Sequence, residues 1–91
     1  MNQYMFERFE RSNNLNKKYD AILKNKQNNK HVRVPFGDKK YEQYEDKTGL
    51  GLYNNLNHLD NKRRIAFRKR HGYFLKPGFF SPGYFSYYFL W

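Results

Sequence analysis

The densest group of chemically active side chains in this 91-residue sequence lies at Arg63–His71, which reads RRIAFRKRH. Guanidinium and ammonium groups bind phosphate and carboxylate, and arginine holds either anion through two parallel hydrogen bonds. The candidate nucleic-acid-binding or anion-binding residues are Arg63, Arg64, Arg68, Lys69 and Arg70. The simplest alternative is a basic run that serves only as a localisation signal.

A second unusual segment is the C-terminal run Gly83–Trp91, GYFSYYFLW, which is almost entirely aromatic. Aromatic side chains are enriched at the centres of protein–protein interfaces, where they fill dry pockets. The candidate protein-interface residues are Tyr84, Phe85, Tyr87, Phe89 and Trp91.

The charge of the chain is divided unevenly along its length. The formal net charge is +10, yet all eight acidic residues precede residue 61. Residues 61–91 carry seven Lys or Arg and 11 of the 19 aromatic residues. Basic and aromatic side chains in one segment are typical of proteins that bind polyanions, above all nucleic acid. A solvated basic surface without a partner is the alternative.

The residue types needed for catalysis or metal binding do not form a recognisable set. The chain has no cysteine, so it has neither disulfides nor thiolate metal ligands. His58 and His71 are thirteen positions apart and lack the short spacing of helical metal ligands. No nucleophile elbow, P-loop or dinucleotide fingerprint is present. We expect a non-enzymatic protein with no catalytic residues, metal, cofactor or small-molecule substrate.

The elements that position these residues are predicted to form a small, irregular, α-rich domain, α+β at most. A one-sided apolar stripe consists of Leu15, Tyr19, Ile22 and Leu23. This spacing predicts a helical arm over residues 2–29, which a break at 12–14 divides. The polar run at 25–30 is expected to be a linker.

The second half of the chain is predicted to hold one short extended segment, one helix and a tail. His31–Gly37 alternates and contains Pro35, which favours an extended segment at a sheet edge. Asp60 can cap a basic helix over residues 61–71, and Gly72 can end it. The aromatic tail is expected to be extended, with turns at the two Pro-Gly pairs, 77–78 and 82–83.

Two units follow from this reading: a helical arm with its linker at 1–30, and a small basic and aromatic domain at 31–91. Aliphatic residues are few, and a chain of this length buries a small share of its surface. We therefore expect no well-packed core without a partner.

The order of several short motifs resembles a small uncharacterised domain of nucleocytoplasmic large DNA viruses that infect algae and protists. The motifs are FG at Phe36-Gly37, Tyr41 and Tyr44, HLD at His58–Asp60, RH at Arg70-His71, and GYFSYYFLW at Gly83–Trp91. The chain departs from that domain by an apparent insertion at 45–57, and it replaces an acidic-Trp segment with residues 73–75. The resemblance covers about residues 34–91. It implies a viral setting and an ordered C-terminal domain, and it supplies no activity.

The sequence therefore predicts a structural component of a large assembly, with a virion-associated or minor capsid-type protein of a large DNA virus as the leading hypothesis. Its partners would be nucleic acid or an acidic protein surface, together with other proteins of the assembly. One alternative is a small ribosomal-type RNA-binding protein, including an organellar one. Another is a peripheral membrane-surface protein, although no stretch approaches the length of a membrane span.

The expected location is a virion or a reducing intracellular compartment. The absence of cysteine fits a reducing compartment. The first residues, MNQYMFERFERSNN, lack the apolar stretch of a secretory signal, so we expect no leader peptide. The mitochondrial or organellar matrix is the alternative location.

Overall fold

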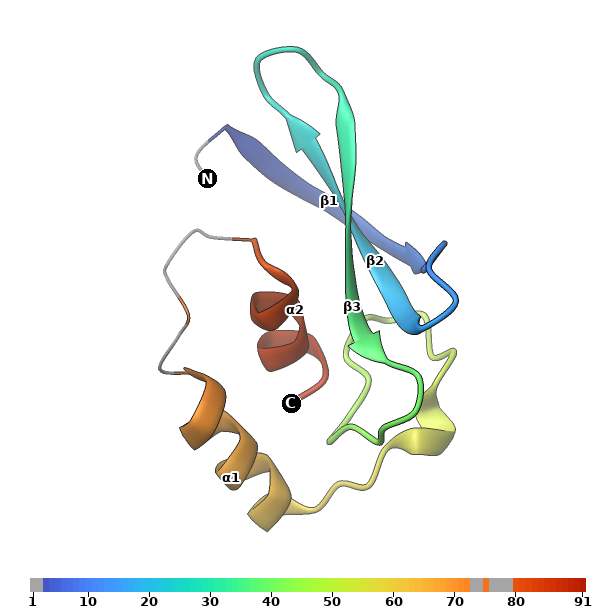
Figure 1. Cartoon of the computed structure of the whole chain (residues 1–91), viewed down its shortest axis with the longest axis vertical. Coiled ribbons are helices and arrows are strands. Elements are labelled where there is room, and N and C mark those ends of the chain that lie inside the picture. The colour runs from blue at the N-terminus through green and yellow to red at the C-terminus, as the bar shows by residue number, and fades with distance from the viewer. Residues whose placement is uncertain (1–2, 73–74, 76–79) are drawn as a thin grey trace.

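The computed structural model describes residues 3–72, 75 and 80–91 of the chain. It contains β1 (Tyr4–Arg11), β2 (Lys17–Asn25), β3 (His31–Asp38), a 3-10 turn η1 (Asn54–Leu56), α1 (Asn61–His71) and α2 (Pro82–Phe89). The strands form an antiparallel sheet in the order β1-β2-β3. Figure 1 shows α2 beside the sheet, with α1 on the side of α2 away from the strands. The protein is thus a small α+β domain, and the prediction of an α-rich fold is wrong.

The predicted N-terminal helical arm is a β-hairpin made of β1 and β2. Three side chains of β2, Tyr19, Ala21 and Leu23, alternate along the strand and are fully buried in the core. The same stretch also satisfies helical spacing, so its apolar pattern fits both structures. Pairing with β1 and β3 on both sides decides in favour of the strand, because tertiary contacts override local preference.

A bulge in β1 brings two phenylalanines that are three positions apart onto the same face of the sheet. Phe6 pairs with Leu23 and Phe9 with Ala21, and the register shifts between Phe6 and Arg8. In a regular strand, residues three apart face opposite sides. The shift lets both phenylalanines pack against the core, with their ring centroids 4.8 Å apart.

The break predicted at residues 12–14 is the turn between β1 and β2. The Ser12 hydroxyl donates a 2.6 Å hydrogen bond to Asp20, and the Asn13 amide donates to the same carboxylate. Asp20 also receives a hydrogen bond from Arg33 of β3. This buried carboxylate therefore connects the turn, β2 and β3.

The extended segment predicted at His31–Gly37 is present as β3, and it lies at the edge of the sheet. Pro35 lies inside β3 and has no N–H to donate. Because β3 is an edge strand, the sheet can do without that hydrogen bond. The polar run at 25–30, predicted to be a linker, forms the tight connection from β2 to β3. Asn29 adopts a positive φ of 61° in that connection, a conformation that asparagine tolerates well.

The aromatic tail is not extended, because residues 82–89 form α2. The Ser81 hydroxyl accepts a hydrogen bond from the Tyr84 amide, and Pro82 occupies the first turn. Both features favour a helix start, so the turn predicted at Pro82-Gly83 is wrong. The turn predicted at Pro77-Gly78 lies outside the described residues.

The core forms where α2 covers the sheet. Its buried members are Tyr19, Ala21, Leu23, Phe36, Phe85 and Leu90. Phe85 contacts Phe9 and Phe36 with ring centroids 5.9 and 5.5 Å apart. Aromatic pairs in such geometries add about 0.5–1.5 kcal/mol each beyond their burial. The chain thus builds a packed core from rings, contrary to the expectation drawn from its few aliphatic residues.

Within residues 3–72, 75 and 80–91, neither helix is long and apolar enough to cross a lipid bilayer.

Candidate anion-binding site

The basic helix has the bounds and the cap that the sequence predicts. The Asp60 side chain accepts hydrogen bonds from the amides of Lys62 and Arg63, and Gly72 follows the last turn. A carboxylate at this end also interacts favourably with the positive end of the helix dipole. None of the residues of α1 is fully buried, so the helix keeps its place through a few contacts on one side.

Two of the five predicted anion-binding residues lie on the inner side of α1. Arg64 donates through Nε to the Trp91 carbonyl oxygen at 2.8 Å, and its guanidinium lies 4.7 Å from the centre of the Tyr44 ring. The Arg68 guanidinium lies 4.1 Å from the centre of the Tyr87 ring on α2. Such cation–π contacts hold a guanidinium against an aromatic face. Arg64 and Arg68 therefore connect α1 to the aromatic segment.

The other predicted residues lie toward solvent. Lys69 and Arg70 are exposed, and so is Lys62 at the start of the helix. Among the described residues, no carboxylate lies within ion-pair distance of these three. Arg63 pairs with Glu42 at 2.9 Å, and both side chains are about half exposed. We call Lys62, Lys69 and Arg70 the outer basic face.

The acidic residues are largely engaged elsewhere in the protein. Seven of the eight accept a hydrogen bond from this chain: Glu7, Glu10, Asp20, Asp38, Glu42, Asp46 and Asp60. On the sheet, Glu10 lies between Arg33 and Arg8, and these guanidinium groups lower the pKa of its carboxyl. Apart from the Arg63–Glu42 ion pair and the Asp60 cap, the basic side chains of α1 have no carboxylate within ion-pair distance among the described residues.

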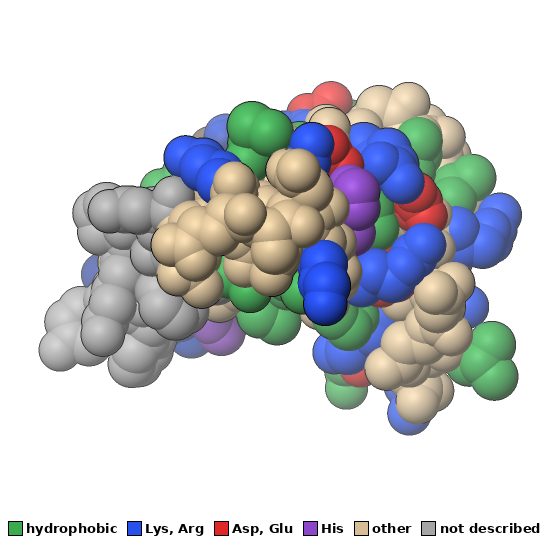
Figure 2. Space-filling view, turned by 90° about the horizontal axis from the view of Figure 1, so that it is seen from above, with side chains coloured by type: hydrophobic (Ala, Val, Ile, Leu, Met, Phe, Trp, Pro, Cys, Tyr) green, Lys and Arg blue, Asp and Glu red, His purple; other side chains and the backbone are tan. Residues whose placement is uncertain are grey.

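Positive charge also extends beyond α1. Figure 2 looks down on the view of Figure 1 and shows Lys and Arg side chains in blue over much of that face, with Asp and Glu in red between them. A test of the outer basic face therefore needs control variants that remove the same charge elsewhere.

The five aromatic residues predicted as protein anchors are placed within the domain. Phe85 is fully buried in the core, whereas Tyr84, Tyr87, Phe89 and Trp91 are half-buried. Their contact with another protein stays a prediction, and their contacts within this chain are already extensive. The neighbouring Tyr88, which the sequence did not single out, is the most exposed ring of α2 at 46%.

A ladder of four rings joins α1 to the end of α2. Trp91 stacks on Phe67, with centroids 4.3 Å apart and planes 6° from parallel. His71 lies 4.2 Å beyond Phe67, and His58 lies 5.1 Å from Trp91. Burial and the nearby Arg63 lower the pKa of His58, whose Nδ1 accepts a hydrogen bond from the Asp60 amide. The neutral form of His58 is therefore favoured here.

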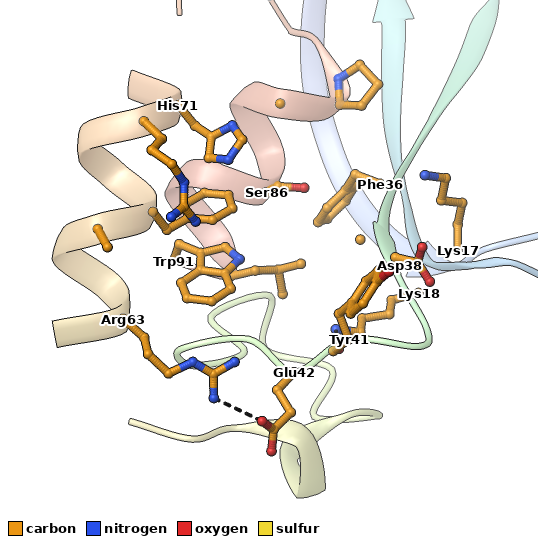
Figure 3. Close-up of a pocket in the computed structure, with 17 residues that line it drawn as sticks. Lys17, Lys18, Phe36, Asp38, Tyr41, Glu42, Arg63, His71, Ser86 and Trp91 are labelled. Carbon is orange, nitrogen blue, oxygen red and sulfur yellow. Dashed lines mark hydrogen bonds and ion pairs between the residues drawn. The ribbon is translucent and has the colours of Figure 1, made fainter. Parts of the chain in front are cut away.

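A pocket of about 800 Å³ lies between β3, α1 and α2 (Figure 3). Its walls carry the aromatic side chains Phe36, Phe67 and Trp91 and the exposed Tyr41. Four basic side chains, Lys17, Lys18, Arg63 and Arg70, and two acidic ones, Asp38 and Glu42, line it as well. The sequence did not indicate this site, because its lining comes from segments far apart in the chain.

Lys18 is an unusual member of this lining, because it is only 2% exposed. Its ammonium donates to the Tyr41 carbonyl oxygen at 2.7 Å and to the Gln43 side-chain oxygen. Desolvation lowers the pKa of Lys18 to about 8, although Asp38 and Asp46 oppose the shift. Burial of a lysine without an ion-paired carboxylate is costly, so such a group calls for a reason.

No three His, Asp or Glu side chains in the described part of the chain lie close enough together to hold a metal ion.

Comparisons with protein-family models, with curated proteins and with solved structures find no match to this chain. The resemblance to the viral domain family therefore stays a prediction.

Proposed function

We propose that the protein is a non-enzymatic structural component of a nucleic-acid-containing assembly, and that it contacts phosphates through the outer basic face. The single observation behind the proposal is that the basic residues of α1 fall into two groups, one in contact with the domain and one exposed to solvent. Arg64 and Arg68 attach the helix to the aromatic segment. Lys62, Lys69 and Arg70 are exposed, and no carboxylate of the described residues lies within ion-pair distance of them. A surface of this kind gains affinity for nucleic acid by releasing counterions.

The attachment of α1 to the aromatic segment supports the same proposal. Side chains on a fixed helix are already arranged for a partner, so less ordering entropy is lost on binding. The setting in a virion rests on the sequence resemblance alone, and an RNA-containing assembly of ribosomal type is the alternative.

The test is the affinity for duplex DNA and for single-stranded RNA, measured by fluorescence anisotropy over a range of salt concentrations. The variant Lys62→Gln/Lys69→Gln removes two charges from the outer basic face and leaves the pocket lining intact. For duplex DNA, each lost phosphate contact lowers the slope of log K against log salt by about 0.9, so the slope should fall by about 2.

The matched control is Lys26→Gln/Lys30→Gln, which removes the same charge from exposed positions around the β2–β3 connection. We expect its slope to stay close to that of the parent protein. An equal loss in both variants would mean that only net charge matters, and the outer basic face would be ruled out as the contact. A flat salt dependence in the parent protein would instead favour an acidic protein partner, and tighter binding of RNA would favour the ribosomal-type alternative.

A further inference from the structure

The lining of the pocket between β3, α1 and α2 includes the most exposed aromatic ring among the described residues. Tyr41 is 67% exposed, whereas the next ring, Tyr88, is 46% exposed and lies outside the pocket. Most other rings of the domain are packed against the core or against each other. An exposed ring at the edge of a hollow offers its face to a flat partner.

The backbone that carries Tyr41 is held in place on both sides. Its amide donates to the Asp38 carbonyl oxygen at 3.2 Å, and its carbonyl oxygen accepts from the buried Lys18 ammonium at 2.7 Å. Lys18 also donates to the Gln43 side chain, so the buried lysine helps to fix the segment around Tyr41. A ring on a fixed backbone loses little conformational freedom when a partner stacks on it.

The opposite wall of the pocket belongs to one face of α1 (Figure 3). Its residues follow the i, i+3, i+4, i+7 spacing of a helical face and are Arg63, Ala66, Phe67 and Arg70. Arg63 and Arg70 are seven positions apart, which is about 10 Å along the helix axis. They would therefore contact different phosphates along an extended strand rather than one phosphate together.

The charges around the pocket favour a negatively charged occupant. Arg70 is exposed, and no carboxylate of the described residues lies within ion-pair distance of it. Arg63 pairs with Glu42, but both side chains are about half exposed, and such pairs are weak enough to exchange for phosphate. Because Arg70 also belongs to the outer basic face, the two basic surfaces are continuous.

The remaining lining suits a nucleobase. Phe67 and Trp91 are half-buried and supply apolar surface, and the Ser86 hydroxyl points into the pocket and can donate to a base (Figure 3). Cations beside an exposed aromatic ring are typical of sites for single-stranded nucleic acid, where bases stack and phosphates meet the cations. The bases of a duplex are stacked inside it and would have to leave the stack to reach Tyr41.

We propose that the pocket binds a single-stranded segment of nucleic acid, with a base stacked on Tyr41 and phosphates at Arg63 and Arg70. This inference rests on the proposed function, since Arg70 belongs to both surfaces, and it specifies which form of nucleic acid the protein holds.

The first test compares the affinity of the whole chain for a thymidine oligonucleotide and for a duplex of the same length. Tyr41→Ala should weaken single-strand binding at least about fivefold, the loss expected for one stacked base, and leave duplex binding unchanged. Tyr41→Phe keeps the ring and should bind like the parent protein. The matched control Tyr88→Ala removes an exposed ring outside the lining and should change neither affinity. Unchanged single-strand affinity in Tyr41→Ala, or an equal loss for both nucleic acids, would overturn the proposal.

Trp91 provides a second measurement, because it is the only tryptophan of the chain and lines the pocket. A base beside an indole quenches its fluorescence, whereas a phosphate alone does not. The thymidine oligonucleotide should therefore quench Trp91 at saturation, and inorganic polyphosphate, which carries charge without bases, should not. Equal changes with the two ligands would mean that the bases stay outside the pocket, and the proposal would be wrong.

The pocket and the outer basic face can fail separately. Lys62→Gln/Lys69→Gln leaves the pocket lining intact, so it should weaken binding of single strand and duplex alike and keep the quenching of Trp91 at saturation. If this variant bound like the parent protein while Tyr41→Ala lost single-strand affinity, the outer basic face would be ruled out and the pocket retained. The reverse result would rule out the pocket alone.

Discussion

Trp91 lies flat against Phe67 of α1, and its carbonyl oxygen accepts a hydrogen bond from Arg64, one turn earlier in the same helix. One residue thus holds α1 by its ring and by its backbone. Because no residue of α1 is fully buried, these contacts are a large part of what fixes the helix to the domain.

Trp91→Ala should therefore loosen α1. Truncation of a buried Trp or Phe costs about 3–5 kcal/mol, and for this half-buried ring we expect about 2 kcal/mol of unfolding free energy. Urea denaturation measures the loss, and hydrogen exchange should show faster opening of the α1 amides. The control Tyr88→Ala removes a more exposed ring from α2 and should cost less than 1 kcal/mol. Equal costs for the two variants would contradict the anchoring role of Trp91.

Arg68→Gln should reduce stability rather than nucleic-acid binding. Its guanidinium lies over the Tyr87 ring, and loss of a partly buried cation–π contact is expected to cost about 1 kcal/mol. Lys69→Gln, the neighbouring exposed position, should show the opposite pattern, with stability kept and binding weakened. Thermal unfolding and anisotropy on the same two variants make the comparison. If Arg68→Gln weakened binding more than Lys69→Gln, the assignment of inner and outer sides would be wrong.

Gly37→Ala should be more damaging than Gly49→Ala, although both glycines have positive φ, 76° and 85°. An alanine pays the same backbone cost of about 1 kcal/mol at either position. At Gly37 the added carbon would also lie 2.9 Å from Leu90 Cδ1 and 3.3 Å from the Lys18 side chain, whereas nothing lies within 4 Å at Gly49. We expect a further loss of about 1–3 kcal/mol at Gly37 from overpacking. Denaturant unfolding of the two variants gives this difference directly, and a similar loss at both would contradict the close approach of Leu90.

The buried Lys18 should make stability rise with pH. Its pKa is about 8 in the folded chain and has the ordinary value of 10.5 in the unfolded one. Between those values the unfolded state holds more protons, so the free energy of unfolding increases as pH rises through this window. The full effect is roughly 3 kcal/mol at 1.36 kcal/mol per pKa unit.

The measurement is urea unfolding from pH 7 to 9.5 for the parent protein and for Lys18→Met, in which the rise should be much smaller. Lys47, whose pKa is also lowered by burial, leaves a residual rise in both proteins. The upper limit avoids Tyr19, since burial and the Asp46 carboxylate raise its pKa to about 12 and its contribution has the opposite sign above pH 10. Parallel pH profiles for the two proteins would show that Lys18 is not desolvated as described.

The sequence predicted α1 because its signals are local. Asp60, Gly72 and the run between them lie within thirteen positions, and each acts on its immediate neighbours. Pro35 likewise indicated that β3 would be an edge strand. The hairpin of β1 and β2 could not be predicted in the same way, because a stripe that includes Tyr19 and Leu23 suits a helix and a strand alike, and the choice rests on partners elsewhere in the chain.

The candidate site likewise has features that local sequence predicts and features that depend on distant parts of the chain. The basic residues of α1 were found from composition, but the split between Arg64 and Lys69 depends on which side of the helix meets Tyr44 and Tyr87. Neither ring is near α1 in the sequence. The pocket gave no sequence signal, since Lys18 is an ordinary lysine until β3 and the segment around Gln43 enclose it.

The packing of α2 on the sheet has a consequence for synthesis of the protein. The three strands pair with neighbours in sequence and can form as soon as residue 38 has left the ribosome, yet Phe85 and Leu90, which complete the core, follow about fifty residues later. Throughout that interval Phe6, Phe9 and Phe36 of the nascent sheet lack the cover that α2 later provides. Aromatic surface that is exposed during folding favours aggregation, so the incomplete chain is expected to aggregate more readily than the finished domain.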